Sequence, residues 1–310
     1  AYFTIEVAFM KQLTKNSLQD RLNLAFFLFP TMLFVIIFIA FPVLFSGYLS
    51  LTEFNYASDP APKFIGLNGY IEMVKNDVFF HTALFNQMRF AVVYFVLAFA
   101  VSLVLAIFVN ELQRGVQVFQ VIFYMPMIVP MSLVGITFAW ILSPDLGIFN
   151  HVLRLIGLGH ITHDWYGEPS TALNSLVLAR TWKMIGFTLI IFLAGLQGIS
   201  KSLKESARVD GANFFQEIVF IVLPNLKPYM LIGGIWILIN SLKVFVLPQV
   251  ITGGGPGSAT MTLYLYSWKL AFERLHMGEA SQVAYLTAFI ILFFTWILNL
   301  IFKPETAQKG

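Results

Sequence analysis

The chain has 310 residues, of which 58% are hydrophobic and 11% are charged, and its net charge is +3. A soluble core of this length does not need that much apolar surface, so the bilayer is the expected solvent, and the small charge argues against a nucleic-acid partner. Because there is no cysteine, a disulfide framework, a thiol nucleophile and a cysteine metal site are excluded.

Six apolar runs, each long enough to cross a bilayer, follow one another along the chain. They predict membrane-spanning helices at about residues 24–46, 88–109, 119–142, 171–196, 229–251 and 280–302. We expect one membrane domain over residues 24–302, preceded by a cytoplasmic or interfacial segment over 1–23 and followed by a cytoplasmic tail over 303–310. The expected fold class is therefore an all-α polytopic membrane protein.

Polar connections alternate between the two sides of these spans. Residues 50–83, 143–170 and 252–257 are predicted as outer loops, the second of them with a short amphipathic helix over 148–156. The inner side, which includes residues 198–226, collects ten Lys and Arg side chains against six on the outer side. This excess of positive charge predicts that both termini and residues 198–226 lie in the cytoplasm.

Residues 198–226 form a charged, small-residue island between two apolar runs. Their pattern predicts two short helices joined at Gly211, with Asp210 as the cap of the second helix. Pro224 and Pro228 are expected to end that helix before the next membrane run. A polar helix-turn-helix that projects from a membrane bundle offers a contact surface to a partner in the water.

The island also contains a motif with fixed spacing. It reads Glu-Ser-Ala, three residues, Gly, nine residues, Ile, one residue and Leu-Pro, formed by Glu205, Ser206, Ala207, Gly211, Ile221, Leu223 and Pro224. This motif resembles the cytoplasmic signature of the inner-membrane permease subunits of binding-protein-dependent sugar ABC importers, of the maltose and glycerol-3-phosphate type, with Ser206 in place of one alanine. The resemblance extends from about residue 24 to residue 302, and within the family it points to importers of alginate oligosaccharides.

The resemblance implies a type I ABC importer permease fold, with six transmembrane helices and a cytoplasmic coupling helix-turn-helix. The chain would be a non-catalytic, multi-pass subunit of the bacterial inner membrane, paired with a second homologous permease subunit. Two cytoplasmic ATPase subunits would bind ATP and Mg, and a periplasmic solute-binding protein would deliver an oligosaccharide. The residues themselves agree that hydrolysis lies elsewhere, because the chain has no Gly-Lys-Ser/Thr phosphate loop.

The same resemblance assigns two groups of residues to partner contacts. The coupling residues that would dock in a cleft of an ATPase subunit are Glu205, Ser206, Ala207, Asp210, Gly211, Ala212, Leu223 and Pro224. The outer glycine-rich residues that would meet the solute-binding protein are Thr252, Gly253, Gly254, Gly255 and Pro256. The alternatives are a solvated loop without a partner for the first group and a simple flexible turn for the second.

Polar side chains inside the predicted spans indicate a substrate path, because such groups are costly in a bilayer unless they face a cavity or a partner. The predicted path residues are Ser132, Arg180, Lys183, Phe187, Asn240, Ser241, Lys243 and Val244. The three cations among them would favour an anionic cargo, such as a uronic-acid oligosaccharide or a sugar phosphate. For Arg180 and Lys183 the alternative is that the side chains extend to the outer interface of the membrane.

Other functional classes remain open at this point. An ion- or proton-coupled secondary carrier would use the intramembrane cations as coupling sites and would transport with an ion gradient and no ATP. A non-transporting membrane receptor is a third class. A metal site is suggested by His151, His160, His163 and Asp164, but solvation in an outer loop is favoured, so no metal is predicted.

Overall fold

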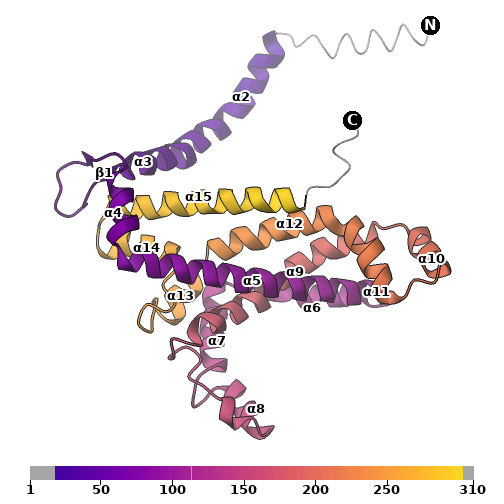
Figure 1. Ribbon diagram of the computed structural model, residues 1–310. Helices are drawn as coiled ribbons and strands as arrows, with labels where there is room; N and C mark the ends of the chain where they lie inside the picture. Colours follow the sequence, from indigo (N-terminus) through magenta and orange to yellow (C-terminus); the bar gives the residue numbers. More distant parts are fainter. Residues whose placement is uncertain (1–17, 113, 303–310) are drawn as a thin grey trace, which may run out of the picture.

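The computed structural model describes residues 18–112 and 114–302, and this part of the chain is mostly helical (Figure 1). Two short strands of the described residues, β1 (Thr52–Glu53) and β2 (Lys63–Phe64), pair antiparallel in the connection between α3 and α4. The all-α fold class is confirmed.

Helices of very different lengths make up this part of the chain. In order, they are α2 (Leu18–Val35), the π-helical η1 (Ile36–Ala40), α3 (Phe41–Leu49), α4 (Asn68–Asn76), α5 (Val78–Asn110), α6 (Val116–Ile128), α7 (Met131–Ile141), α8 (Ile148–Leu155), the 3-10 helix η2 (Gly159–Ile161), α9 (Ala172–Gln197), α10 (Lys201–Val209), α11 (Phe214–Glu217), the π-helical η3 (Ile218–Val222), α12 (Leu223–Leu242), α13 (Val246–Ile251), α14 (Leu263–Trp268), the π-helical η4 (Lys269–Glu273) and α15 (Met277–Ile301).

Membrane-length helices account for most of the predicted spans. Within the described residues, the segments that are long and apolar enough to cross a bilayer are Asn23–Leu49, Val78–Asn110, Ala172–Gln197, Phe214–Ile251 and Met277–Ile301. The predicted span at 119–142 is a bent pair instead, because α6 and α7 meet at an angle of 97°. The described part of the chain therefore has five continuous candidate spans, or six if the bent pair is counted as one.

Two helix boundaries differ from the sequence prediction. α5 begins at Val78 rather than at residue 88, because the Asp77 carboxylate accepts a hydrogen bond from the amide of Phe80 at 2.9 Å and caps the longer helix. The expectation that Pro224 and Pro228 end the second helix of the island is wrong, since a helical segment runs without interruption from α11 through η3 into α12. Pro224 lies in the first turn of α12, where proline is tolerated, and it follows the wider π-helical turns of η3.

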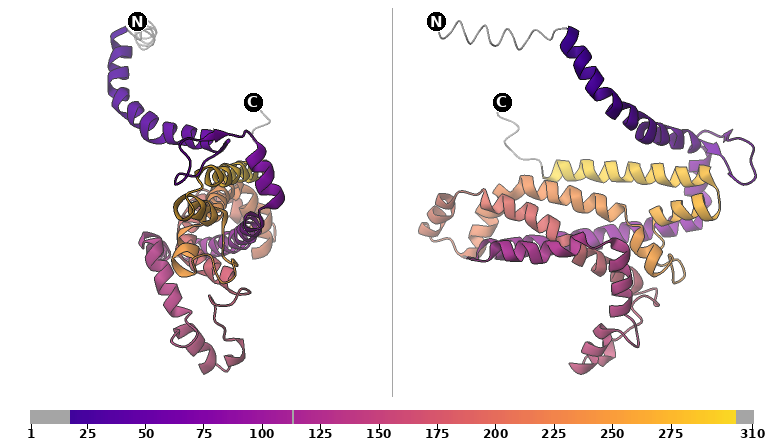
Figure 2. Two further views of the ribbon diagram at one scale, coloured as in Figure 1. Left: turned by 90° about the vertical axis from the view of Figure 1, so that its left-hand side faces the viewer. Right: turned by 180° about the vertical axis from the view of Figure 1, so that it is seen from behind.

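The core of the bundle lies where α5, α9 and α12 meet. These helices run side by side, and α6 lies along α9 (Figures 1 and 2). Tyr94 of α5, Leu176 of α9 and Ile237 of α12 are buried in one apolar cluster. Gly186 allows α6 to approach α9 closely, because a Cβ at this position would lie 2.0 Å from the carbonyl oxygen of Phe123.

The two polar ends of the bundle are far apart. α10 and α11 form one end, whereas β1, α4 and α14 lie at the other (Figure 1). α7 and α8 project to one side, and α2 extends away from the bundle with its apolar side chains exposed (Figure 2). Exposed apolar side chains along a membrane-length helix suit contact with lipid or with another apolar subunit.

Candidate functional site

The predicted helix-turn-helix forms one polar end of the bundle. α10 ends at Val209, α11 begins at Phe214, and the turn between them passes through Gly211. Gly211 has a φ of +87°, a left-handed conformation that favours glycine, and nothing lies within 4 Å of the position that a Cβ would take. The amide of Ala212 donates to the carbonyl of Ala207 at 2.9 Å and closes the turn.

The cap of the second helix differs from the sequence prediction. Asp210 follows the last residue of α10, and α11 is capped by Asn213 instead. The Oδ1 atom of Asn213 accepts from the amide of Gln216 at 2.9 Å, and the Oε1 atom of Gln216 accepts from the amide of Asn213 at 2.9 Å. Because the turn extends to Ala212, the cap lies at Asn213 rather than at Asp210, and Asn213 forms a capping box with Gln216.

A charged brace holds the two helices of this end together. Arg208 of α10 donates to both carboxylate oxygens of Glu217 in α11, at 2.7 Å from Nε and 3.3 Å from the second nitrogen. The hydrogen bond with Glu217 raises the pKa of Arg208 above its ordinary value. Lys204 lies 3.8 Å from Glu111 at the end of α5, so α10 is also linked to the bundle. We refer to the pair Arg208–Glu217 as the brace.

The predicted coupling residues face outward at this end. Exposed residues of the set are Glu205, Ser206, Asp210, Gly211 and Pro224, and half-buried ones are Ala207, Ala212 and Leu223. Val209, which sequence reasoning did not single out, is 87% exposed beside the turn. Its place between the charged residues Arg208 and Asp210 was the available signal for it. The end as a whole offers a surface that combines these polar residues with the exposed apolar side chains of Leu203, Val209, Phe214 and Phe215.

Lys183 of α9 points to the break between α6 and α7. Its Nζ atom donates to the carbonyls of Pro126, Met127 and Val129 at 3.3, 2.7 and 2.5 Å. α6 ends at Ile128, so these carbonyls lie at or just beyond its C-terminal end, where carbonyls carry partial negative charge, and that of Pro126 also accepts from the amide of Val129 at 3.3 Å. The side chain is buried, with 6% of the residue exposed, and it does not extend to an interface.

Arg180, one turn earlier on α9, serves a second helix end. Its guanidinium donates to the carbonyl of Asn240 at 2.6 Å, in the last turn of α12, and lies over the ring of Tyr94 at 5.6 Å. Arg180 is only 5% exposed. The two cations on one face of α9 therefore hold the carbonyl ends of α6 and α12, both of which end inside the bundle.

The other predicted path residues fall into two groups. Lys243, at the end of α12, and Ser132, on α7, are exposed, whereas Phe187 and Asn240 are half-buried. The ring of Phe187 lies 4.4 Å from that of Trp236. Ser241 and Val244 are completely buried. The structure thus brings Arg180 and Asn240 into direct contact and leaves Lys243 as the accessible cation of the predicted set.

The glycine-rich loop that follows α13 is held by its own hydrogen bonds. The hydroxyls of Thr252 and Thr260 lie 2.6 Å apart, and Thr260 also donates to the carbonyl of Gly255 at 2.7 Å. Gly253 and Gly254 have left-handed φ values of +61° and +96°. The loop therefore has a defined turn, with Gly253 exposed at its tip.

The chain is similar to known transport proteins over most of its length. The family model described as binding-protein-dependent transport system inner membrane component matches residues 98–303. The chain is 31% identical over 287 residues to the probable ABC transporter permease protein YurN of Bacillus subtilis, across 92% of this chain and 97% of that protein. It is 32% identical over 269 residues to the trehalose/maltose transport system permease protein MalF of Thermococcus litoralis, across 86% and 88% of the two chains.

A solved structure has a similar fold. It is the crystal structure of a bacterial ABC transporter involved in the import of the acidic polysaccharide alginate, which matches with a TM-score of 0.79 and 24% identity, across 95% of this chain and 99% of that chain. The likeness agrees with the predicted type I importer permease fold. The family match favours an ATP-driven importer over an ion-coupled carrier. The chain belongs to the family of binding-protein-dependent transport system inner membrane components, the permease subunits of ABC transporters.

Proposed function

We propose that this permease subunit forms half of the translocation path of an ATP-driven importer of oligosaccharides. The observation that carries the proposal is the braced helix-turn-helix, which bears the signature motif at one polar end of the bundle. The similarity to a trehalose/maltose permease supports a sugar as the cargo. The chain itself is a non-catalytic, multi-pass inner-membrane component, and partner ATPase subunits hydrolyse ATP, with Mg²⁺ bound beside the nucleotide there.

Coupling runs through the helix-turn-helix in this proposal. It docks in a cleft of one of two cytoplasmic ATPase subunits, and closure of the ATPase pair moves it together with the membrane helices. The brace makes α10 and α11 move as one body, and the 3.8 Å contact between Lys204 and Glu111 passes the movement to α5. In this orientation both termini face the cytoplasm, residues 24–302 form the membrane domain, and a second homologous permease subunit supplies the other half of the path.

The cargo path follows the accessible side chains of α7, α9 and α12. Cargo contacts are assigned to Ser132, Phe187, Asn240 and Lys243, with Arg180, Lys183, Ser241 and Val244 as the buried wall behind them. The exposed ammonium of Lys243 favours an anionic oligosaccharide, such as one built from uronic acids. An alginate oligosaccharide is the specific candidate. The solute-binding protein delivers it at the opposite end from the ATPases and contacts residues 252–256.

Reconstitution tests the proposed function directly. The chain is assembled with its partner permease, ATPase subunits and solute-binding protein in liposomes, and ATP hydrolysis and uptake are measured with neutral and acidic oligosaccharides. We expect hydrolysis to rise when the loaded binding protein is added and acidic sugars to be taken up. Uptake driven by an ion gradient without ATP would refute the proposal.

A matched pair of glycine substitutions tests the coupling role. Gly211→Val and Gly157→Val place the same side chain at left-handed positions, with φ of +87° and +82°, and nothing lies within 4 Å of either Cβ position. The two variants therefore carry similar backbone strain, but Gly157 lies in the outer loop that follows α8. We expect Gly211→Val to abolish uptake and Gly157→Val to retain it. Equal losses in both variants would contradict the coupling role of the turn.

A further inference from the structure

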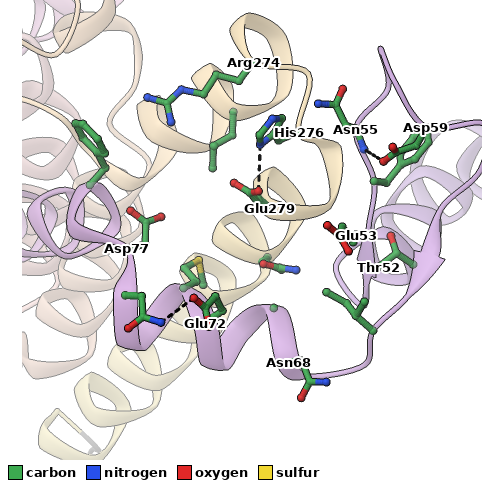
Figure 3. Close-up of a pocket in the computed structure, with 18 of the residues that line it drawn as sticks. Thr52, Glu53, Asn55, Asp59, Asn68, Glu72, Asp77, Arg274, His276 and Glu279 are labelled. Atoms are coloured by element: carbon green, nitrogen blue, oxygen red, sulfur yellow. Dashed lines mark hydrogen bonds and ion pairs between the residues drawn. The ribbon is translucent and has the colours of Figure 1, made fainter.

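A cavity of about 840 Å³ lies at the polar end opposite α10 and α11. It is enclosed by the segment that carries β1, by α4, and by the segment that joins α14 to α15 (Figure 3). This volume is in the range of cavities that hold a small ligand or a group of side chains. None of the residues assigned to coupling, cargo or the glycine-rich loop lines it.

The lining of this cavity is strongly acidic. Carboxylates come from all of its walls and are Glu53, Asp59, Glu72, Asp77 and Glu279, against a single guanidinium, Arg274, and one imidazole, His276 (Figure 3). Glu279 pairs with His276 at 3.1 Å, and among the described residues none of these carboxylates forms an ion pair with Arg274, whose guanidinium lies over the ring of Phe79 at 5.5 Å. The five carboxylates still outnumber the guanidinium and the imidazole, so the cavity carries an excess of negative charge.

Some of these carboxylates are fixed by the fold, and others are available. Asp77 accepts from the hydroxyl of Tyr266 at 2.6 Å, and Glu72 accepts from the side-chain amide of Asn76 at 2.7 Å. Burial, and in second place the hydrogen bond to Asp77, raises the pKa of Tyr266, so this hydroxyl stays a donor at neutral pH. Glu53, by contrast, is exposed to the cavity and has no hydrogen bond or ion pair from its side chain among the described residues.

A buried amide also faces the cavity without a partner. Gln282 of α15 is only 2% exposed and lines the cavity, and its side chain has no hydrogen-bonding partner within the described part of the chain. Because the residue lines the cavity, its amide is available to hydrogen-bond to a group that enters there. Gly69 of α4 keeps the space open, because a Cβ there would lie 2.1 Å from the Nε2 atom of Gln282.

We propose that this cavity is a docking socket for the solute-binding protein and receives a lysine- or arginine-bearing segment of it. The inference rests on the proposed function, and it goes beyond the contact assigned to residues 252–256. A lysine or arginine side chain would place its cation among the carboxylates and could donate to the oxygen of the Gln282 amide. Cargo is a weaker fit, since sugar hydroxyls need no such excess of negative charge and a uronic-acid sugar would be repelled.

The experiment measures how much solute-binding protein is needed to stimulate ATP hydrolysis of the reconstituted complex. The test variant is Glu53→Lys with Glu279→Lys, both at exposed carboxylates of the cavity, and the control is Asp145→Lys, at an exposed outer-loop position away from it. We expect the half-saturating concentration of the binding protein to rise about tenfold in the test variant at low salt and to stay unchanged in the control. A rise in ionic strength should weaken docking to the unsubstituted complex more than to the test variant.

Two further measurements test whether docking depends on the charge of the cavity. A tetralysine peptide should compete with the binding protein for the unsubstituted complex and not for the test variant, whereas tetraglutamate should compete with neither. If the double lysine variant does not assemble, Glu53→Gln with Glu279→Gln should still raise the half-saturating concentration about threefold. A half-saturating concentration within about twofold of the unsubstituted complex in an assembled variant overturns the inference, as does a changed sugar preference with docking unchanged. Failure of any binding protein to stimulate the unsubstituted complex refutes the proposed function instead.

Discussion

Lys183→Met is the substitution that most directly separates a structural from a cargo-binding role for the cations of α9. The ammonium donates to three backbone carbonyls, at 2.5–3.3 Å, around the break between α6 and α7. Hydrogen bonds to a charged group contribute about 1.5–3 kcal/mol each, and buried carbonyls left without a donor cost about 1–3 kcal/mol each. Removal of the buried ammonium recovers several kcal/mol of desolvation in return. We expect a net loss of about 3 kcal/mol in the free energy of unfolding.

Thermal unfolding of the purified complex measures this loss. At roughly 2 °C per kcal/mol for a chain of this size, the midpoint should fall by about 6 °C at a fixed scan rate. The control is Lys243→Met, which makes the same chemical change at an exposed position. Its midpoint should move by about 1 °C or less, while its uptake of acidic oligosaccharides should fall. An unchanged midpoint in Lys183→Met together with weaker uptake of acidic sugars would refute the reasoning and place Lys183 on the cargo path.

Three other substitutions, the first with a matched control, test the helix packing and the helix-turn-helix. Gly186→Ala should destabilise the chain, because the added Cβ would lie 2.0 Å from a backbone oxygen. The control Gly198→Ala should be tolerated, because the atom nearest to its Cβ lies 3.4 Å away. The two variants are compared by the fraction of protein that remains folded after detergent extraction. Glu217→Gln weakens the brace to Arg208, and we expect the number of sugar molecules taken up per ATP hydrolysed to fall. An unchanged ratio would contradict a role of the brace in coupling. Asn213→Ala removes the cap of α11 at a cost of about 1 kcal/mol, which faster hydrogen exchange of the first amides of that helix would reveal.

The span count could be predicted from the sequence, because apolar runs of membrane length are a local signal. The bend between α6 and α7 could be predicted in part: Pro130 follows Val129, which has the extended backbone that proline imposes on its predecessor. The angle of 97° could not, since the end of α6 is held by Lys183, 54–57 residues away in the chain. Backbone carbonyls are the partners in this contact, and they leave no trace in the sequence.

The helix-turn-helix of α10 and α11 also combines features that the local sequence predicts with a contact that it does not predict. The spacing of the motif and the left-handed Gly211 were readable, and so was the capping box, since Asn213 and Gln216 stand at the spacing that forms one. The brace was not readable, because Arg208 and Glu217 are nine positions apart and come together only through the turn. A helix of constant direction would place them on different faces.

The exposed helical segment Asn23–Leu49 has a consequence for how the protein is made. None of the central apolar window of the segment Asn23–Leu49 is buried against the rest of the described chain, and only its α3 end touches α15. In hydrocarbon such a rod is stable on its own backbone hydrogen bonds and requires no neighbour to remain helical. We therefore expect it to enter the bilayer autonomously as it leaves the ribosome, before the remaining helices assemble beside it.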